Sequence, residues 1–259
     1  MSAFYLASLS KRYKILRMAS AQAAPDLDIV LPVHNEAESI ETTLREIHEE
    51  LSPRLRVRFV ICEDGSRDGT PEVLRRLSAV FPMKLETSEA RKGYSRAVVD
   101  AFKMSEAPFV LALDSDGQCD PKDFWSFWEI RDRADVIIGW RVHRSDALLR
   151  KLMSGAFRAV HAMLFHPGLH DPSCPYLLIH KRVLDRLIPE LGVLEQGFWW
   201  EFVARVCGRG FRMQELPVRH RERAAGSTRV YTLSKIPGIA WRHLWGLLTI
   251  RRQLKLGDS

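Results

Sequence analysis

Two aspartates with one residue between them follow an apolar run directly. The run covers residues 108–113, and Asp114 and Asp116 come after it. Carboxylates at positions i and i+2 behind a strand can converge on one hard cation, and Mg²⁺ or Mn²⁺ accepts carboxylate and phosphate oxygens together. An Asp-rich turn is the alternative interpretation of these two residues alone. Their place between a buried strand and Asp120-Pro121 favours a metal site.

Polar residues also follow two earlier apolar runs. These runs end at Val33 and Ile61 and lead into residues 34–36 and 63–66, which carry carboxylates and an amide. Such groups form hydrogen bonds with the hydroxyl and imide groups of a ribose and a base. Two helix-capping turns are the alternative, since Asn35 with a glutamate three residues on resembles a capping box.

Short apolar runs alternate with longer amphipathic segments through the first half of the chain. The predicted strands are 27–33, 57–61, 83–87, 108–113 and 135–139. This alternation predicts an α/β fold, with a mostly parallel sheet covered by helices on both faces. Ligands of such sheets bind beyond the carboxyl ends of the strands, where the polar residues cluster. The second half predicts helices near 146–164 and 196–207, strands at 176–180 and 211–218, and a C-terminal amphipathic helix.

The two turns, the Arg91-Lys92-Gly93 segment and the sequence Asp114-Ser115-Asp116-Gly117-Gln118-Cys119-Asp120-Pro121 together resemble glycosyltransferase family 2. The resemblance spans residues 26–230, and by motif it points to the dolichyl- or polyprenyl-phosphate sugar synthases. It implies a GT-A (Rossmann-like) fold. It also implies an inverting, metal-dependent transfer of a sugar from a UDP- or GDP-linked donor.

The resemblance assigns a donor site. Asp114, Asp116 and Gln118 match the ligands of the metal, Mg²⁺ or Mn²⁺, and Asp116 is also expected to be catalytic. Arg223 matches an arginine that contacts the diphosphate, so it joins both the nucleotide site and the catalytic group. The other residues expected around the nucleotide are Pro32, Val33, Asn35, Glu36, Glu63, Asp64, Lys92, Gly93 and Ser115. The family usually carries Asp where this chain has Glu63, so a carboxylate is kept with a different reach.

The resemblance also implies a polyprenyl phosphate acceptor, of the dolichyl or undecaprenyl type. Arg141, Arg150 and Ser154 match positions that bind the acceptor phosphate, and Arg141 is counted among the catalytic residues. An Arg and a Ser four residues apart share a helix face and can reach one anion.

Glu201 keeps a second interpretation open. It matches the region where relatives with hydroxyl acceptors carry a general base. A lipid phosphate is already anionic and needs no base, so with that acceptor Glu201 would position the sugar or a neighbouring arginine. The alternatives are therefore a family 2 enzyme acting on a hydroxyl, or a non-catalytic carbohydrate- or lipid-binding module. The complete Asp114, Asp116 and Gln118 set argues against the module.

The basic charge lies at the two ends of the chain. The 259 residues include 39 basic and 32 acidic ones, and 46% are hydrophobic, which excludes disordered and collagen-like chains. Residues 1–25 hold four basic and no acidic side chains, and residues 217–259 hold nine basic and two acidic ones. We predict a basic amphipathic arm (1–25), for which a frayed leader is the alternative, a catalytic domain (26–230) and an amphipathic tail (231–259). The tail would bind an anionic membrane surface, pack on the catalytic domain or form a homo-oligomer contact.

No run reaches the ~18 uncharged apolar residues of a membrane-spanning helix, and no secretory signal is evident. We therefore expect a cytoplasmic protein, bound peripherally to the cytosolic face of a membrane. The arginines of residues 219–229 accompany no recognised nucleic-acid module, so no nucleic-acid partner is expected.

Overall fold

The computed structural model describes residues 24–142, 148–221 and 236–256. The strands are β1 (Leu27–Val33), β2 (Val57–Glu63), β3 (Met83–Thr87), β4 (Phe109–Ala112), β5 (Val136–Arg141), β6 (Leu177–His180) and β7 (Met213–Val218). The helices are α2 (Ile40–Leu51), α3 (Thr70–Ser78), α4 (Tyr94–Met104), α5 (Phe124–Glu129), α6 (Leu148–Phe165), α7 (Lys181–Leu187), α8 (Phe198–Gly208) and α9 (Ile236–Leu256), with 3₁₀ turns η1 (Pro121–Asp123) and η2 (Ile188–Glu190). The predicted arm lies outside the described residues, apart from its last two positions.

The seven strands form one sheet in the order β3-β2-β1-β4-β6-β5-β7. All neighbouring pairs are parallel except the two that involve β6, which runs antiparallel to β4 and β5. The predicted mostly parallel α/β sheet is therefore confirmed. Because β6 alone is reversed, it begins at the edge of the sheet where its neighbours β4 and β5 end.

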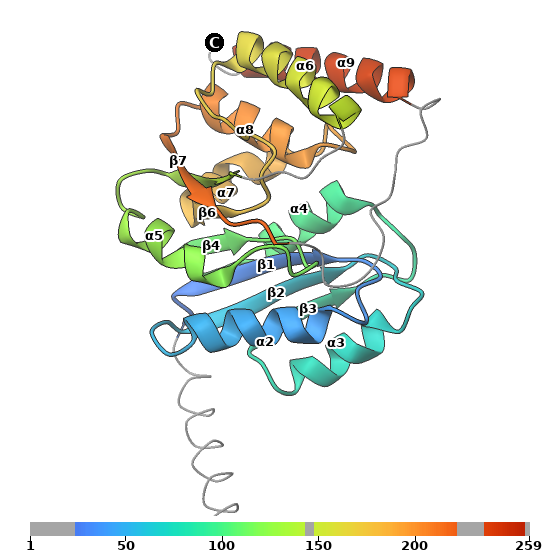
Figure 1. The fold of residues 1–259 in the computed structure, drawn as a ribbon, viewed down its shortest axis with the longest axis vertical. Coiled ribbons are helices and arrows are strands. Elements are labelled where there is room, and N and C mark those ends of the chain that lie inside the picture. Colours follow the sequence, from blue (N-terminus) through green and yellow to red (C-terminus); the bar gives the residue numbers. More distant parts are fainter. Residues whose placement is uncertain (1–23, 143–147, 222–235, 257–259) are drawn as a thin grey trace, which may run out of the picture.

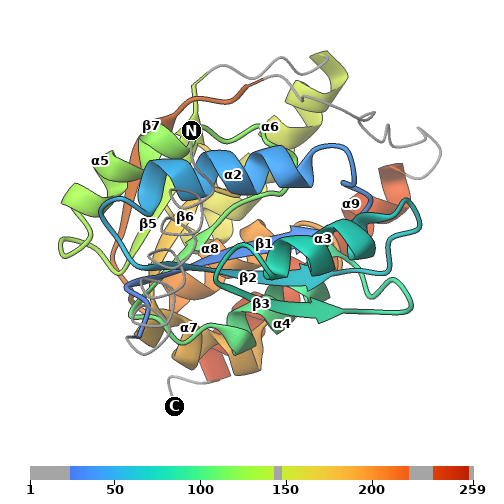
Figure 2. The ribbon, with the colours of Figure 1, turned by 90° about the horizontal axis from the view of Figure 1, so that it is seen from below.

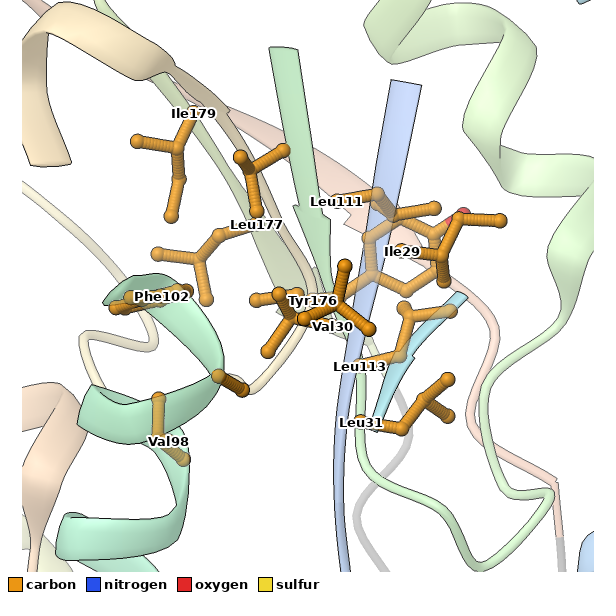
Figure 3. Close-up of a cluster of buried hydrophobic side chains, with 14 of the residues drawn as sticks. Ile29, Val30, Leu31, Val98, Phe102, Leu111, Leu113, Tyr176, Leu177 and Ile179 are labelled. Carbon is orange, nitrogen blue, oxygen red and sulfur yellow. The ribbon is translucent and has the colours of Figure 1, made fainter. Parts of the chain in front are cut away.

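Helices cover both faces of the sheet. In Figure 1, α2 and α3 lie below the strands, whereas α4 lies above them, and Figure 2 shows α2 and α3 from below. All seven residues of β1 are buried, as expected for a central parallel strand with both faces covered. Figure 3 shows Val98 and Phe102 of α4 on one side of β1, and Ile29 and Leu31 on the other.

A smaller apolar cluster joins α6, α8 and α9 away from the sheet (Figure 1). Its buried members are Leu194, Ala204, Leu247, Ile250 and Leu254. The predicted C-terminal helix is therefore present, and one side of it packs against the rest of the protein.

Gly65 allows two turns to approach each other closely. Its φ of +66° lies in the left-handed region, and a Cβ atom there would sit 2.6 Å from the Arg91 nitrogen and 2.7 Å from the Ala90 carbonyl carbon. Any side chain at residue 65 would therefore push the turn after β2 away from the turn before α4.

We predict that Gly65→Ala lowers the free energy of unfolding by about 2–3 kcal/mol, because it adds a backbone clash to the strain of a positive φ. Urea unfolding followed by circular dichroism measures the change. Gly69→Ala is the matched control, since Gly69 has a φ of +88° but nothing within 4 Å of its added Cβ. An equal loss in both variants would show that the contact between the turns contributes nothing.

Candidate functional site

Asp114 and Asp116 lie just beyond the carboxyl end of β4, with both side chains partly buried. The Tyr94 hydroxyl donates to Asp114 Oδ1 over 2.7 Å, and the Gln118 backbone N–H donates to Asp116 Oδ1 over 3.1 Å. In the described part of the chain, Asp116 forms no ion pair. Ser115 between them is buried.

The side chains of this loop fit a hard divalent cation. Gln118 Nε2 donates to the Arg221 carbonyl oxygen over 3.0 Å, which leaves the amide oxygen of Gln118 as its ligand atom. Together with the two carboxylates it makes an all-oxygen donor set, of the kind that Mg²⁺ and Mn²⁺ take.

The turns after β1 and β2 interlock. The Asn35 N–H donates to the Ser66 hydroxyl over 2.8 Å, and Asn35 Oδ1 accepts from the Arg67 N–H over 2.9 Å. The Glu36 N–H donates to the Thr70 hydroxyl over 2.9 Å. The expected capping box is therefore wrong: Asn35 sits at a φ of +56°, and its side chain bonds to the neighbouring turn.

Two buried carboxylates stand at the end of β2, next to the buried Pro32 and Val33 of β1. Asp64 accepts the backbone N–H groups of Lys92 and Gly93, with distances of 3.0 and 3.1 Å from Gly93. Glu63 Oε1 accepts the Ser66 N–H, whereas its Oε2 is buried without a hydrogen-bond partner among the described residues. Glu63 thus has spare acceptor capacity beside the interlocked turns.

The Lys92 side chain turns away from this pocket toward the edge of the sheet. Its Nζ lies 2.8 Å from Glu86 Oε1, 2.7 Å from Asp100 Oδ2 and 3.8 Å from Cys62 Sγ. Burial disfavours the charged amine, but the hydrogen bonds to Asp100 and Glu86 raise the pKa of Lys92. Cys62, Glu86 and Asp100 could otherwise gather around a cation, and the ammonium of Lys92 takes that place. Lys92 therefore contributes to the pocket through its backbone N–H, which donates to Asp64, and not through its side chain.

Arg141 is partly buried beside Asp171, a carboxylate in the segment that leads into the reversed β6. Its Nε lies 2.7 Å from Asp171 Oδ2 and its Nη2 lies 3.0 Å from Asp171 Oδ1 and from the Ser173 hydroxyl. Burial disfavours the charged guanidinium, but these bonds and the charge of Asp171, with a smaller effect of Asp114, raise the pKa of Arg141. Arg141 therefore stands near the loop that carries Asp114, with a fixed orientation.

Two aspartates that follow Gln118 in the chain, Asp120 and Asp123, anchor a later segment. Asp120 lies 3.1 Å from Arg219 Nη1 and 2.9 Å from Arg221 Nη2, and Asp123 accepts the Arg219 N–H over 2.7 Å. Burial disfavours ionisation of Asp120, but hydrogen bonds from the Lys122 N–H and Arg221 lower its pKa. These anchors were not predicted from the sequence, although the alternating basic residues from position 219 are a signal for them.

Three predicted site residues are not described in the same detail. Arg223 lies outside the described residues, two positions after the anchored Arg221. Arg150 and Ser154 belong to α6, but their side chains are not among those described.

Glu201 is fully buried and heavily hydrogen bonded. Its oxygens accept the backbone N–H groups of Gly192, Val193 and Leu194 over 3.2, 3.2 and 2.7 Å. Arg205, also 0% exposed, donates to Glu201 Oε1 over 2.9 Å. The carboxylate therefore holds the loop before α8 rather than facing a surface that an acceptor could reach.

This loop and α9 line a cavity of about 370 Å³ that is open to solvent. The Ser95 hydroxyl, next to Tyr94, lies 2.8 Å from the Leu194 carbonyl oxygen and so ties one cavity wall to the start of α4. Trp241 and Trp245 line the other wall and are 67% and 63% exposed.

A family model described as glycosyl transferase family 2 matches residues 28–188. The chain belongs to glycosyltransferase family 2. This result confirms the resemblance drawn from the motifs, and it makes the protein a glycosyltransferase.

Curated relatives of this glycosyltransferase include two from Haloferax volcanii. Glycosyltransferase AglD is 27% identical over 252 residues, which are 91% of this chain but only 39% of that protein. Dolichyl-phosphate hexose transferase is 27% identical over 209 residues, which are 79% of this chain and 86% of that protein. An undecaprenyl-phosphate 4-deoxy-4-formamido-L-arabinose transferase from Aeromonas hydrophila is 26% identical over 209 residues, covering 78% of this chain and 62% of that protein.

Solved structures share the fold. Glucosyl-3-phosphoglycerate synthase from Mycobacterium tuberculosis, in complex with phosphoglyceric acid, has a TM-score of 0.63 at 16% identity, covering 89% of this chain and 81% of that one. Mannosyltransferase PcManGT from Pyrobaculum calidifontis, in complex with GDP-Man and Mn²⁺, has a TM-score of 0.59 at 17% identity, covering 90% and 74%.

We predict that Glu201→Gln lowers the free energy of unfolding of the glycosyltransferase by about 3 kcal/mol, because it removes the charge paired with the buried Arg205. Urea unfolding provides the measurement, and Glu195→Gln, at an exposed position of the same loop, is the control. A Glu201→Gln variant as stable as wild type but inactive in transfer would contradict the structural role and support a general base.

Proposed function

We propose that this glycosyltransferase moves a hexose from a UDP- or GDP-linked donor to a polyprenyl phosphate, with inversion at the anomeric carbon. One observation carries the proposal: a cavity beside the exposed tryptophans of α9 has its other wall fastened to the start of α4, where Tyr94 holds Asp114. An apolar acceptor and a charged donor could thus meet at one place. Two relatives named for dolichyl or undecaprenyl phosphate support this acceptor class.

The donor half of the proposed site is the sheet edge. Asp114, Asp116 and Gln118 would hold Mg²⁺ or Mn²⁺, which when bound would neutralise the diphosphate as a Lewis acid. Asn35, Glu36, Glu63, Asp64 and the backbone of Lys92 and Gly93 would surround the nucleotide, over the floor made by Pro32 and Val33. The unpartnered Glu63 Oε2 suits a donor group of the nucleotide. We assign Arg223 to the leaving diphosphate, since its segment starts from the anchored Arg221.

The acceptor half needs positive charge and no base. Arg141 is fixed near Asp114, and we assign Arg150 and Ser154 of α6 to the acceptor phosphate with it. A phosphate oxygen so held can displace the nucleotide in line, and catalysis then rests on positioning and electrostatics. The buried, fully bonded Glu201 favours this acceptor over a hydroxyl, which would need a base within its reach.

We further propose that α9 docks on the anionic cytosolic face of a membrane. Residues 236–256 contain no acidic side chain, and the large apolar side chains exposed among those described there are Trp241, Leu244, Trp245 and Leu248. Tryptophan and arginine beside aliphatic residues suit the headgroup boundary. None of the described helices is long and apolar enough to cross a bilayer. A contact between two copies is the competing use of this face.

A transfer assay tests the reaction. Protein, Mn²⁺ and labelled UDP- and GDP-hexoses are mixed with and without polyprenyl phosphate, and label is counted in the lipid extract. We expect lipid label that is lost with a chelator, and a loss of at least about 100-fold in Asp116→Ala because a metal ligand is missing. Asp132→Ala, at an exposed position outside the site, is the control.

The results of this assay test the metal assignment and distinguish a phosphate acceptor from a hydroxyl acceptor. Full activity of Asp116→Ala would refute the metal assignment. Nucleotide release that ignores the lipid, with no label in the extract, would replace the phosphate acceptor by a hydroxyl.

We predict that replacing both Trp241 and Trp245 by Ser weakens binding to liposomes containing anionic lipid by about tenfold or more, because two exposed apolar anchors are lost. Cosedimentation measures the binding. The unfolding free energy should change little, since both side chains are largely exposed. Val80→Ser is the control, since Val80 is an apolar residue that is 53% exposed and follows the end of α3 in the sequence. Unaltered liposome binding would leave self-association as the use of this face.

A further inference from the structure

A chain of two hydrogen bonds ends on Asp114. Trp199 Nε1, near the start of α8, lies 2.8 Å from the Tyr94 hydroxyl oxygen, and that oxygen lies 2.7 Å from Asp114 Oδ1. An indole N–H can only donate, so Tyr94 accepts from Trp199 and its single proton is left for Asp114. The direction of the chain is therefore fixed as Trp199 to Tyr94 to Asp114.

Packing holds the donor end of this chain in one orientation. Trp199 is only 6% exposed, and its ring contacts Phe198, Phe202 and Phe102 with centroid distances of 5.0, 5.9 and 6.4 Å. The three contacts are edge-to-face, the geometry that aromatic pairs prefer. The indole N–H consequently has a fixed direction, and it fixes the Tyr94 oxygen in turn.

The donor to Asp114 is a phenolic O–H, which is neutral. It orients the carboxylate without cancelling its negative charge. A lysine or arginine in that place would hold the carboxylate equally well but would oppose the approach of a cation.

We infer that Tyr94 is a positioning residue for the cation that Asp114 binds, and that Trp199 orients Tyr94 for this task. The inference rests on the proposed metal-dependent function. Groups that hydrogen-bond to a metal ligand orient it before the ion arrives, and removing one typically costs 10- to 100-fold in affinity.

The same two elements connect the cation site to the acceptor side. Ser95 directly follows Tyr94 and holds the cavity wall, and Glu201, two residues after Trp199, holds the loop that forms this wall. The starts of α4 and α8 therefore hold both the proposed cation site and the wall of the proposed acceptor cavity, and Tyr94 lies between them.

Binding of Mn²⁺ alone, measured as the loss of the free-ion signal in electron paramagnetic resonance, tests the inference without turnover. We expect Tyr94→Phe to bind Mn²⁺ about tenfold more weakly than wild type, because it removes one oxygen and leaves the ring. Trp199→Phe should weaken binding in the same direction by a smaller factor. Tyr176→Phe is the matched control, since it removes a buried tyrosine hydroxyl that has no hydrogen-bond partner among the described residues.

Two results would overturn the inference: the first would refute only the role of Tyr94, and the second would refute the metal site as well. If Tyr94→Phe binds Mn²⁺ as wild type does while Asp114→Ala does not, Tyr94 has no positioning role but the metal site stands. If wild type and Asp114→Ala bind Mn²⁺ equally, the metal site itself is wrong. Thermal melting checks the fold of each variant. Should Tyr94→Phe be unfolded, Trp199→Phe decides, because it breaks the same chain one step earlier.

Discussion

Repulsion between like charges is the constraint that shapes the site. The carboxylates of Glu36, Glu63, Asp64, Asp114, Asp116 and Asp120 all lie at or beyond the carboxyl ends of three adjacent strands. Each accepts at least one hydrogen bond from a backbone N–H or a hydroxyl: Ser39 for Glu36, Ser66 for Glu63, Gly93 for Asp64, Tyr94 for Asp114, Gln118 for Asp116 and Lys122 for Asp120. The surrounding turns therefore adopt conformations that point these donors toward the carboxylates. A bound cation would further reduce a repulsion that these hydrogen bonds already lower.

Much of this arrangement follows from local sequence. Parallel strands buried on both faces are apolar throughout, so short apolar runs reveal the strand before Asp114 and the alternation of strands and helices. The polar turns after Val33 and Ile61 are found because they follow such runs. The place of Asp114 and Asp116 at the same edge as Glu63 and Asp64 then follows from strand direction alone.

Other features depend on contacts between distant segments, and no local pattern encodes them. The predicted strand at 176–180 could be placed along the chain, but not its reversed direction, which brings Asp171 to Arg141. Lys92 has the right place for a ligand contact, yet Glu86 and Asp100 attract its ammonium elsewhere. The burial of Glu201 depends on three N–H groups of a loop seven to nine residues earlier. Carboxylates are thus easy to find in sequence, but whether one is a metal ligand, a general base or a structural hydrogen-bond acceptor depends on its surroundings.

The order of the strands also limits how copies of the protein could assemble. β3 and β7 form the two edges of the sheet, where unpaired backbone groups could recruit a strand from another molecule. On β7, Pro217 has no N–H to offer, and on β3 the side chains of Lys84 and Glu86 carry charges engaged with Glu106 and Lys92. Both borders are therefore protected against strand addition, and a sheet continuous across two molecules is disfavoured. Within the described part of the chain, helical surfaces are left for self-association, and there side chains rather than main-chain ladders determine which neighbour is accepted.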